Sequence, residues 1–441
     1  RSMLAFALPM LLGNLLQQCY NIADTLIVGQ FLGRNALAAV GSSFTLMTFL
    51  TSILLGMCMG SGAVFSLCYG GREFSRLRRS VYVSFLMIFS FTLMLNLSVF
   101  CFLDPILSLL SVPQTVAPVM REYLWAVFWG IGGTFLYNFF AALLRAVGNS
   151  MAPLLFLGAA AVLNIGLDLL FVLVFRMGAS GAAWATAAAQ WLSGAGLAVY
   201  SLLRFPKFFP RREDCRFEKH TASEIARFSG LTCLQQSVMN FGILMVQGLV
   251  NSFGAAVMAA FAAAVKIDSF AYMPVQDFGN AFSTFIAQNH GAGRDDRVRS
   301  GVKSAVRLST GFSLAVSLLV FLFAKPLLLL FIRPEETEIL SIGVQYLRIE
   351  GSFYCGIGAL FLLYGLYRAI GRPGMSLVLT VISLGTRVLL AYLLSAVPAF
   401  GVAGIWWSVP IGWGLADAVG LLYYLYLRHR EQKSPAAGSP L

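Results

Sequence analysis

Residues 152–175 read APLLFLGAAAVLNIGLDLLFVLVF, a run in which Asp168 is the only charged side chain. A helix needs about 20 apolar residues to cross the hydrocarbon core of a bilayer. The run is continuous, whereas the strands of membrane barrels alternate between apolar and polar residues. This stretch therefore predicts a transmembrane helix.

The rest of the chain has the same character. Of its 441 residues 58% are hydrophobic and only 11% are charged, whereas soluble domains carry about 25% charged residues. This composition excludes a water-soluble enzyme, and it leaves no soluble domain whose basic face could bind nucleic acid. We predict an all-α integral membrane protein with twelve transmembrane helices, at residues 3–28, 36–68, 81–104, 118–145, 152–175, 179–203, 223–251, 256–289, 301–332, 339–367, 374–397 and 402–427.

The basic residues indicate the orientation of these helices. Loops that follow even-numbered segments hold 18 Lys and Arg residues, and loops that follow odd-numbered segments hold five. Because cytoplasmic loops carry the excess of basic residues, both termini are predicted on the cytoplasmic side. The net charge of +12 is thus explained by topology.

An internal repeat relates the two halves of the chain. A shift of 221 residues, which becomes 223 after Pro334, superimposes glycines, arginines and aromatic residues. Each half holds six segments, an even number, so the halves form parallel repeats related by an axis along the membrane normal. The matched pairs include Gly33 with Gly254, Gly70 with Gly291, Arg76 with Arg297, Tyr123 with Tyr346, Arg145 with Arg368, Gly148 with Gly371, Gly178 with Gly401, and Trp184 with Trp407.

The repeat predicts four parts in the chain. These are an N-terminal six-helix lobe (1–204), a cytoplasmic linker (205–222), a C-terminal six-helix lobe (223–428) and a disordered tail (429–441). Thr221 and Glu224 have the spacing of a capping box and predict the start of the seventh helix. Because the sequence opens at Arg1 and not at a methionine, we expect a short native segment to precede it.

Polar residues inside the first-half segments are the candidate functional residues. Gln17, Tyr20 and Asp24 are spaced three and four apart, and Asn164 and Asp168 four apart, so each set lies along one helix face. An ionisable residue at membrane depth is costly unless it is paired or hydrated. The candidates are completed by Asn138, as a substrate contact, and Thr186, as a cation ligand.

We predict that Asp24 and Asp168 form a buried cluster with Asn164 and Thr186 that binds a proton, with sodium as the alternative ion. Two neighbouring carboxylates in a low dielectric cannot both ionise cheaply, which favours proton binding. Alternatively, each acid hydrogen-bonds locally near a helix end and only fixes packing.

The C-terminal half does not repeat this cluster. Asp24 corresponds to Met245, Asp168 to Ala391 and Asn164 to Arg387. The charged residues of that half are predicted to form internal ion pairs, or alternatively to contact substrate; they are Lys266, Asp268, Asp277, Arg387 and Asp417.

Pro9 lies 15 residues before Asp24 on the same predicted helix. A proline removes a backbone hydrogen bond and allows a helix to bend. The alternative is that Pro9 occupies the first helical turn, where proline is tolerated.

These features resemble the multidrug and toxic compound extrusion (MATE) family of secondary transporters. The resemblance extends from about residue 3 to residue 428, and its motifs are LP–DTLIVGQFLG (8–33), GGREFSR (70–76), RAVG (145–148), NIGLD (164–168), GASG (178–181) and QNHGAG (288–293). It implies a central cavity between two lobes and the export of amphipathic, often cationic compounds by ion antiport.

The resemblance also implies roles for the candidate residues. In the DinF-like branch of the family the positions of Asp24, Asn164, Asp168 and Thr186 form the coupling site. Gln17 and Tyr20 would then face the drug cavity, and the proline would bend the first helix. The NorM-like branch places acids on helices 7 and 10, where this chain has only Glu224 and Glu350.

The resulting prediction is a monomeric antiporter of the bacterial inner membrane, in contact with membrane lipids, that exports amphipathic or cationic drugs and toxins. No cofactor, metal site or nucleic-acid partner is predicted. Alternatives are a flippase for lipid-linked precursors and, from another class, an integral-membrane enzyme. The enzyme is disfavoured because the longest loop offers Glu213, Asp214 and His220 without a catalytic motif.

Overall fold

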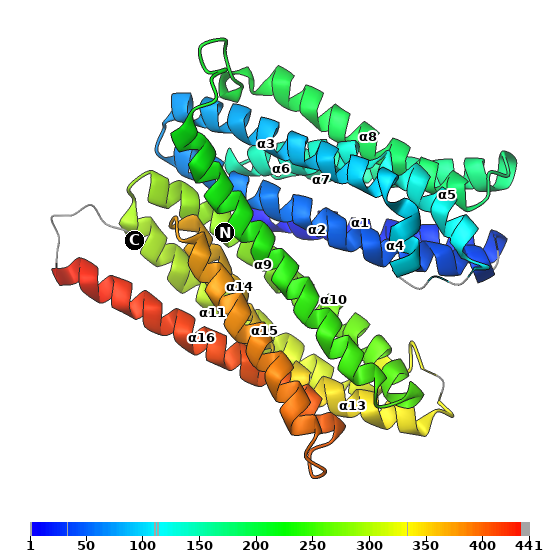
Figure 1. Ribbon diagram of the computed structural model, residues 1–441. Helices are drawn as coiled ribbons and strands as arrows, with labels where there is room; N and C mark the ends of the chain where they lie inside the picture. Colours follow the sequence, from blue (N-terminus) through cyan, green and yellow to red (C-terminus); the bar gives the residue numbers. More distant parts are fainter. Residues whose placement is uncertain (1, 33, 110–111, 113, 333, 434–441) are drawn as a thin grey trace. The chain divides into compact units, whose positions relative to one another are not determined.

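The computed structural model describes residues 2–32, 34–109, 112, 114–332 and 334–433. Every regular element within these residues is a helix (Figure 1). The helices are Ser2–Phe31 (α1), Arg34–Gly70 (α2), Phe74–Cys101 (α3), Leu103–Leu109 (α4), Ala117–Phe128 (α5), Ile131–Ala146 (α6), Met151–Leu169 (α7), Leu170–Val174 (η1), Ala179–Arg204 (α8), Pro206–Phe208 (η2), Lys219–Asn251 (α9), Ala255–Gly291 (α10), Asp295–Leu322 (α11), Ala324–Leu328 (α12), Thr337–Gly351 (α13), Tyr354–Ala369 (α14), Pro373–Ser395 (α15) and Val402–Lys433 (α16).

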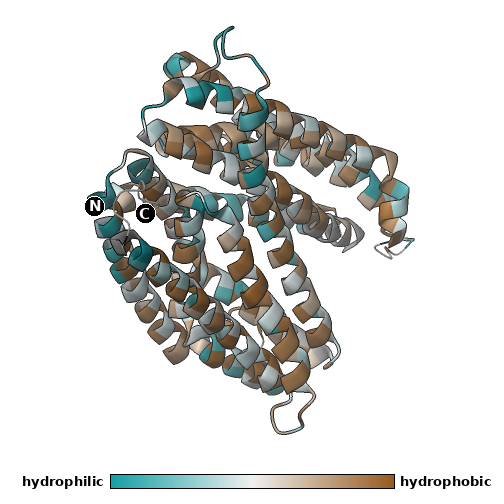
Figure 2. Ribbon diagram, turned by 60° about the vertical axis from the view of Figure 1, so that its left-hand side comes forward, coloured by the Kyte–Doolittle hydropathy of each residue, from teal (hydrophilic) through white to brown (hydrophobic). Residues whose placement is uncertain are grey.

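The helices correspond to the twelve predicted segments. Within the described residues, eight helices are long and apolar enough to cross a membrane, namely α1, α2, α3, α7, α9, α11, α15 and α16. Two further spans are bent pairs, α5 with α6 at 43° and α13 with α14 at 50°, and α8 and α10 coincide with the remaining two segments. Apolar residues run along the helices and hydrophilic ones gather toward their ends and in the loops (Figure 2). Helices suit such segments because lipid offers no partners to backbone polar groups.

The repeat is visible in helix lengths. Helices α2 and α10 both have 37 residues, α3 and α11 both have 28, and α6 and α14 both have 16. Their boundaries are offset by the same 221 or 223 residues as the sequence match. Gly148 and Gly371 have φ of 92° and 80°, a backbone conformation that glycine adopts without strain. The matched glycines therefore hold equivalent turns in both halves.

The chain divides into two compact units, a first unit from Leu4 to Cys233 and a second unit from Leu234 onward. The beginning of α9 belongs to the first unit. The Ser229 hydroxyl lies 2.7 Å from that of Ser61 and donates to the carbonyl of Met57 on α2 at 2.9 Å. A Cβ atom at Gly60 would lie 2.4 Å from the carbonyl oxygen of Phe228. Glycine thus permits direct backbone contact between α2 and the start of α9.

Helices α6 and α8 of the first unit also approach closely through glycine. A Cβ atom at Gly133 would lie 2.6 Å from the backbone of Gln190 and Trp191, and one at Gly194 would lie 2.3 Å from the carbonyl oxygen of Gly133. Contacts this short leave no space for a larger residue.

Three sequence predictions need correction. The capping box is wrong, because α9 begins at Lys219, before Thr221. The disordered tail is wrong for residues 429–433, because α16 continues to Lys433; residues 434–441 lie outside the described part of the chain. The first-turn alternative for Pro9 is also wrong, since α1 begins at Ser2 and Pro9 lies inside it.

Candidate ion-binding site

Two carboxyl groups of the first unit meet inside the protein. Asp24 of α1 and Asp168 of α7 lie within hydrogen-bonding reach of each other. Asp168 is fully buried, Asp24 is 9% exposed and Asn164, one turn before Asp168, is 2% exposed. The predicted meeting of the two acids is thus present, with Asn164 on the same face of α7.

Three of the four oxygen atoms of this carboxylate pair (Asp24 and Asp168) are buried without a donor among the described residues. Both carboxylate oxygens of Asp168, Oδ1 of Asp24 and Oδ1 of Asn164 are buried without a hydrogen-bond partner in the described part of the chain. Two ionised carboxylates cannot donate to each other, so a bond between them requires a proton. Unpaired buried oxygens are costly, and the arrangement is therefore suited to binding a proton or a small cation.

A π-helical turn, η1, directly follows Asp168 at the end of α7. Such turns are rare and occur frequently at functional sites, because the wider turn shifts the register of the side chains that follow. The local sequence is uniformly apolar, so its hydropathy could not predict this change of helix type.

Two tyrosines, Tyr20 and Tyr123, interact electrostatically with the carboxylate pair. Tyr20 interacts with Asp24 and is hydrogen-bonded to Gln17, in agreement with their predicted position on one helix face. Tyr123 of α5 interacts with both carboxylates and with Tyr20. Sequence reasoning did not assign Tyr123 to the site, although its repeat match with Tyr346 marked the position.

Thr186 and Asn138 are not joined to the carboxylate pair by any contact recorded among the described residues. The Thr186 hydroxyl donates to the carbonyl of Ala182 at 3.0 Å. The Asn138 amide donates to the carbonyl of Thr134 at 2.9 Å. Both donors are thus used within their own helices, and the roles predicted for them stay predictions.

The second unit contains a carboxyl cluster that sequence reasoning missed. Asp268 of α10 and Glu350 of α13 lie within hydrogen-bonding reach of each other and are 4% and 1% exposed. The Tyr346 hydroxyl donates to Oδ2 of Asp268 at 3.3 Å, and Tyr354 lies beside the same carboxyl group. Because these residues come from three helices, no spacing along the sequence reveals their meeting.

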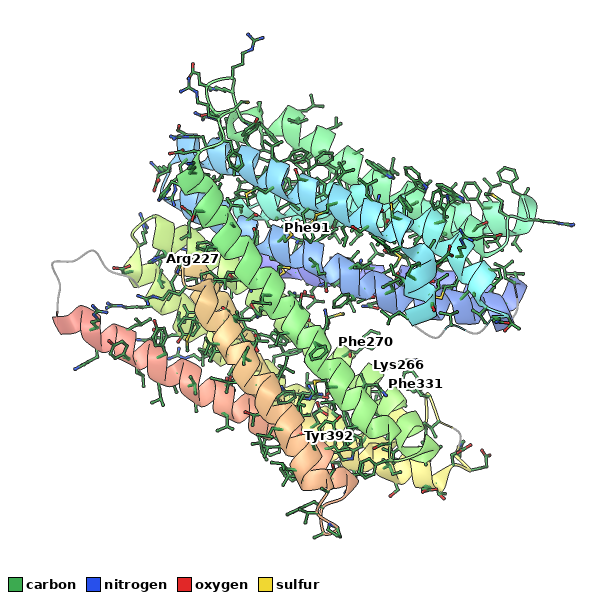
Figure 3. The ribbon with its side chains drawn as sticks, viewed as in Figure 1. Phe91, Arg227, Lys266, Phe270, Phe331 and Tyr392 are labelled. Atoms are coloured by element: carbon green, nitrogen blue, oxygen red, sulfur yellow. The ribbon has the colours of Figure 1, made fainter. Side chains whose placement is uncertain are left out.

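The ion pairs predicted for the second unit are not found for Lys266, Asp268 or Arg387 within the part of the chain that the structure describes. The Lys266 ammonium group lies instead 5.8 Å from the centre of the Phe331 ring, both side chains being exposed on this unit (Figure 3). An aromatic ring attracts a cation at this distance.

Three ion pairs fasten the linker and the start of α9 to α3. The Arg76 guanidinium donates to both carboxylate oxygens of Glu224, at 2.7 and 2.9 Å. Two further pairs join Arg78 to Asp214 at 2.7 Å and Arg79 to Glu218 at 3.0 Å. Burial acts to raise the pKa of Asp214, but hydrogen bonds from Arg78 and the backbone of Arg211 outweigh it and lower that pKa below its ordinary value.

Replacing Asp214 with Asn is expected to destabilise the protein by about 1–3 kcal/mol at neutral pH, because a largely buried, charge-assisted hydrogen bond is lost. Since the native pKa is lowered, the stabilisation is complete above the ordinary value of about 3.9 and disappears as the pH falls through the native pKa. Unfolding measured in detergent from neutral to acidic pH should show the wild-type advantage shrinking only in acid. Glu218→Gln, in a more exposed pair, is the control and should cost less than about 1 kcal/mol. Equal costs for the two variants would contradict this account.

The family model MatE matches residues 9–170 and 231–393. The chain is 30% identical over 443 residues to the probable multidrug resistance protein YpnP of Bacillus subtilis (strain 168), with 98% of this chain and 96% of YpnP covered. It is 28% identical to the probable multidrug resistance protein YoeA of the same strain, with 98% and 95% covered.

Solved structures share the fold. A crystal structure described as MATE in the bent conformation superimposes with a TM-score of 0.92 at 22% identity, covering 99% of this chain and 97% of that one. Another, of a multidrug resistance MATE family transporter in an outward-facing conformation, gives a TM-score of 0.90 at 22% identity, with 98% and 96% covered.

Proposed function

Because this chain belongs to the MatE family of multidrug and toxic compound extrusion transporters, we propose that it exports amphipathic or cationic drugs and toxins in exchange for protons. The family consists of transporters, so the chain is a multi-pass membrane protein and not an enzyme. The names of its relatives as multidrug resistance proteins support a substrate range of small molecules.

The carboxylate pair of the first unit carries the proposal. Its buried oxygens have no donor among the described residues, and a proton would supply the missing hydrogen bond. An antiporter requires a site that loads an ion on one side of the membrane and releases it on the other. A carboxyl group whose hydration changes as the cavity changes face would bind its proton with different affinity in the two states.

The same site would accept sodium as the alternative ion, since carboxylate and amide oxygens are hard ligands for cations. Proteoliposomes loaded with a fluorescent cationic dye distinguish the ions. We expect efflux when a pH gradient alone is imposed and none when a sodium gradient alone is imposed. Efflux driven by sodium alone would overturn proton coupling, and efflux without any ion gradient would overturn antiport.

Tyr20→Ala is expected to weaken the transport of some aromatic cations more than others, by about 0.5–2 kcal/mol in apparent affinity. Tyr20 is half-buried beside Asp24, and attraction between a cation and an aromatic ring depends on the ligand. Efflux rates across a panel of dyes, with Tyr20→Phe as the control that keeps the ring, provide the measurement. A uniform loss across the panel would indicate a structural role.

We also propose that the protein lies in the bacterial inner membrane and that both of its termini are on the cytoplasmic side. Single cysteines at Arg76 and Arg297 should then be labelled by an impermeant thiol reagent only from the cytoplasm, and cysteines at Arg34 and Gly254 only from outside. The experiment is made in a variant without native cysteines that retains efflux. Labelling of the residue-254 cysteine from inside would contradict parallel repeats.

A further inference from the structure

Both units place two carboxyl groups beside the same tyrosine of the repeat. Tyr123 in the first unit interacts with Asp24 and Asp168, and its match Tyr346 interacts with Asp268 and Glu350. The acids themselves do not correspond, since the shifts place Asp24 and Asp168 on Met245 and Ala391, and place Asp268 and Glu350 on Met47 and Val127. Each unit thus builds a carboxyl pair around one shared position from different helices.

The two pairs differ in their basic neighbours. Arg387 of α15 acts electrostatically on both Asp268 and Glu350. Its repeat match is Asn164, which is uncharged and lies on α7 one turn before Asp168. No basic group acts on Asp24 or Asp168 among the side chains that the structure describes.

The basic neighbour changes the charge balance of the second-unit pair. When two neighbouring carboxyl groups share one proton, the pair retains one negative charge. In a low-dielectric interior that charge requires a cation. In the second unit Arg387 provides a fixed cation. Among the described residues it makes no direct hydrogen bond or ion pair to Asp268 or Glu350. The described side chains of the first unit offer no such fixed cation, which leaves a place for a cation from solution.

We propose that Arg387 is a built-in cation that prevents the second-unit carboxyl pair from taking a proton or sodium ion from solution. The inference rests on the proposed function in that it takes the first-unit pair as the coupling site. Arg387 is half-buried, and its Nε is buried without an acceptor among the described residues. No carboxylate that the structure describes is therefore bonded to that nitrogen. The other titratable groups recorded as acting on the second-unit pair or its tyrosines are Tyr272 of α10, Tyr346 of α13 and Tyr354 of α14.

Arg387→Asn tests this proposal, because it installs the residue that the first unit has at the matching position. The variant is made together with Asp24→Asn and Asp168→Asn, so that any response to cations comes from outside the first-unit pair. Melting temperature is measured in detergent at mildly acidic and mildly alkaline pH, with sodium chloride or with choline chloride at equal ionic strength. The dependence of melting temperature on pH reports proton binding, and its dependence on the salt reports sodium binding.

Arg387→Asn should gain a cation-dependent rise in melting temperature of at least about 2 °C over the parent, because binding to the folded state stabilises it. Arg387→Lys, which keeps the charge, should behave as the parent does. Adding Glu350→Gln to Arg387→Asn should remove the gain. An unchanged cation response in folded Arg387→Asn, or an equal gain in Arg387→Lys, would overturn the proposal.

The proposal can also be tested if the Arg387→Asn variant does not fold. If Arg387→Asn fails to fold without cations, Glu350→Gln should rescue it by removing the uncompensated negative charge, and failure of that rescue would contradict the proposal. The readout involves no transport and uses neutralised first-unit acids. Its failure is therefore separate from failure of the proposed antiport, which is measured as efflux.

Discussion

Neutralising either carboxyl group of the first unit, by Asp24→Asn or Asp168→Asn, is expected to abolish gradient-driven efflux while leaving expression intact. Asn has nearly the same shape as Asp, but its side-chain amide cannot bind and release a proton at physiological pH. The two side chains lie against each other in the interior, so loss of one destroys the shared site. Efflux from proteoliposomes and melting temperature should be measured on the same preparations.

Asp268→Asn and Asp277→Asn are the matched controls, because each changes a buried acid of the second unit in the same way. They should reduce efflux less, or act by lowering stability, since removal of a buried charge leaves its partners unsatisfied. The first-unit mechanism is wrong if Asp24→Asn pumps at the wild-type rate. It is equally wrong if only the second-unit variants lose coupling while they remain folded.

Gly133→Ala is expected to lower stability by about 1–3 kcal/mol, because the added methyl group would lie 2.6 Å from the backbone of α8 and the two helices would have to separate. A melting curve in detergent measures the effect. The same exchange at Gly311 of α11 is the control, since a Cβ atom there meets nothing within 4 Å. Gly311→Ala should raise stability by up to about 1 kcal/mol through helix propensity. A Gly133→Ala protein as stable as wild type would show that α6 and α8 do not require this contact.

The sequence predicts the helices and the repeat well because both depend on local properties. Long apolar runs must form helices in lipid, and glycines with positive φ, such as Gly148 and Gly371, recur wherever the turn recurs. The breaks between α5 and α6 and between α13 and α14 could not be predicted, because hydropathy is continuous across them. They depend on packing against neighbouring helices, as the glycines that face α8 illustrate.

Part of the candidate site could be predicted because it too depends on local properties of the sequence. Asn164 and Asp168 are four residues apart and share a helix face. Because acidic residues are rare in the membrane segments of this half, the sequence also indicated that Asp168 meets Asp24. The pairing of Asp268 with Glu350 could not, because it depends on how α10 and α13 pack. The side chain of Thr186 has a hydroxyl suited to cation binding, but its sequence position does not reveal that this hydroxyl bonds to its own helix.

The division of α9 between the two units affects how the protein can be cut into parts. A fragment ending at Arg204, where the six predicted helices of the N-terminal half are complete, would lack the residues that cover Gly60 and Ser61. It would also lack Asp214, Glu218 and Glu224, the acids that neutralise three arginines of α3. During synthesis the first unit therefore becomes complete only after the chain has emerged to about Cys233. For expressing a half-transporter, or for splitting the gene into two co-expressed pieces, the natural cut lies inside a helix and not in the polar linker.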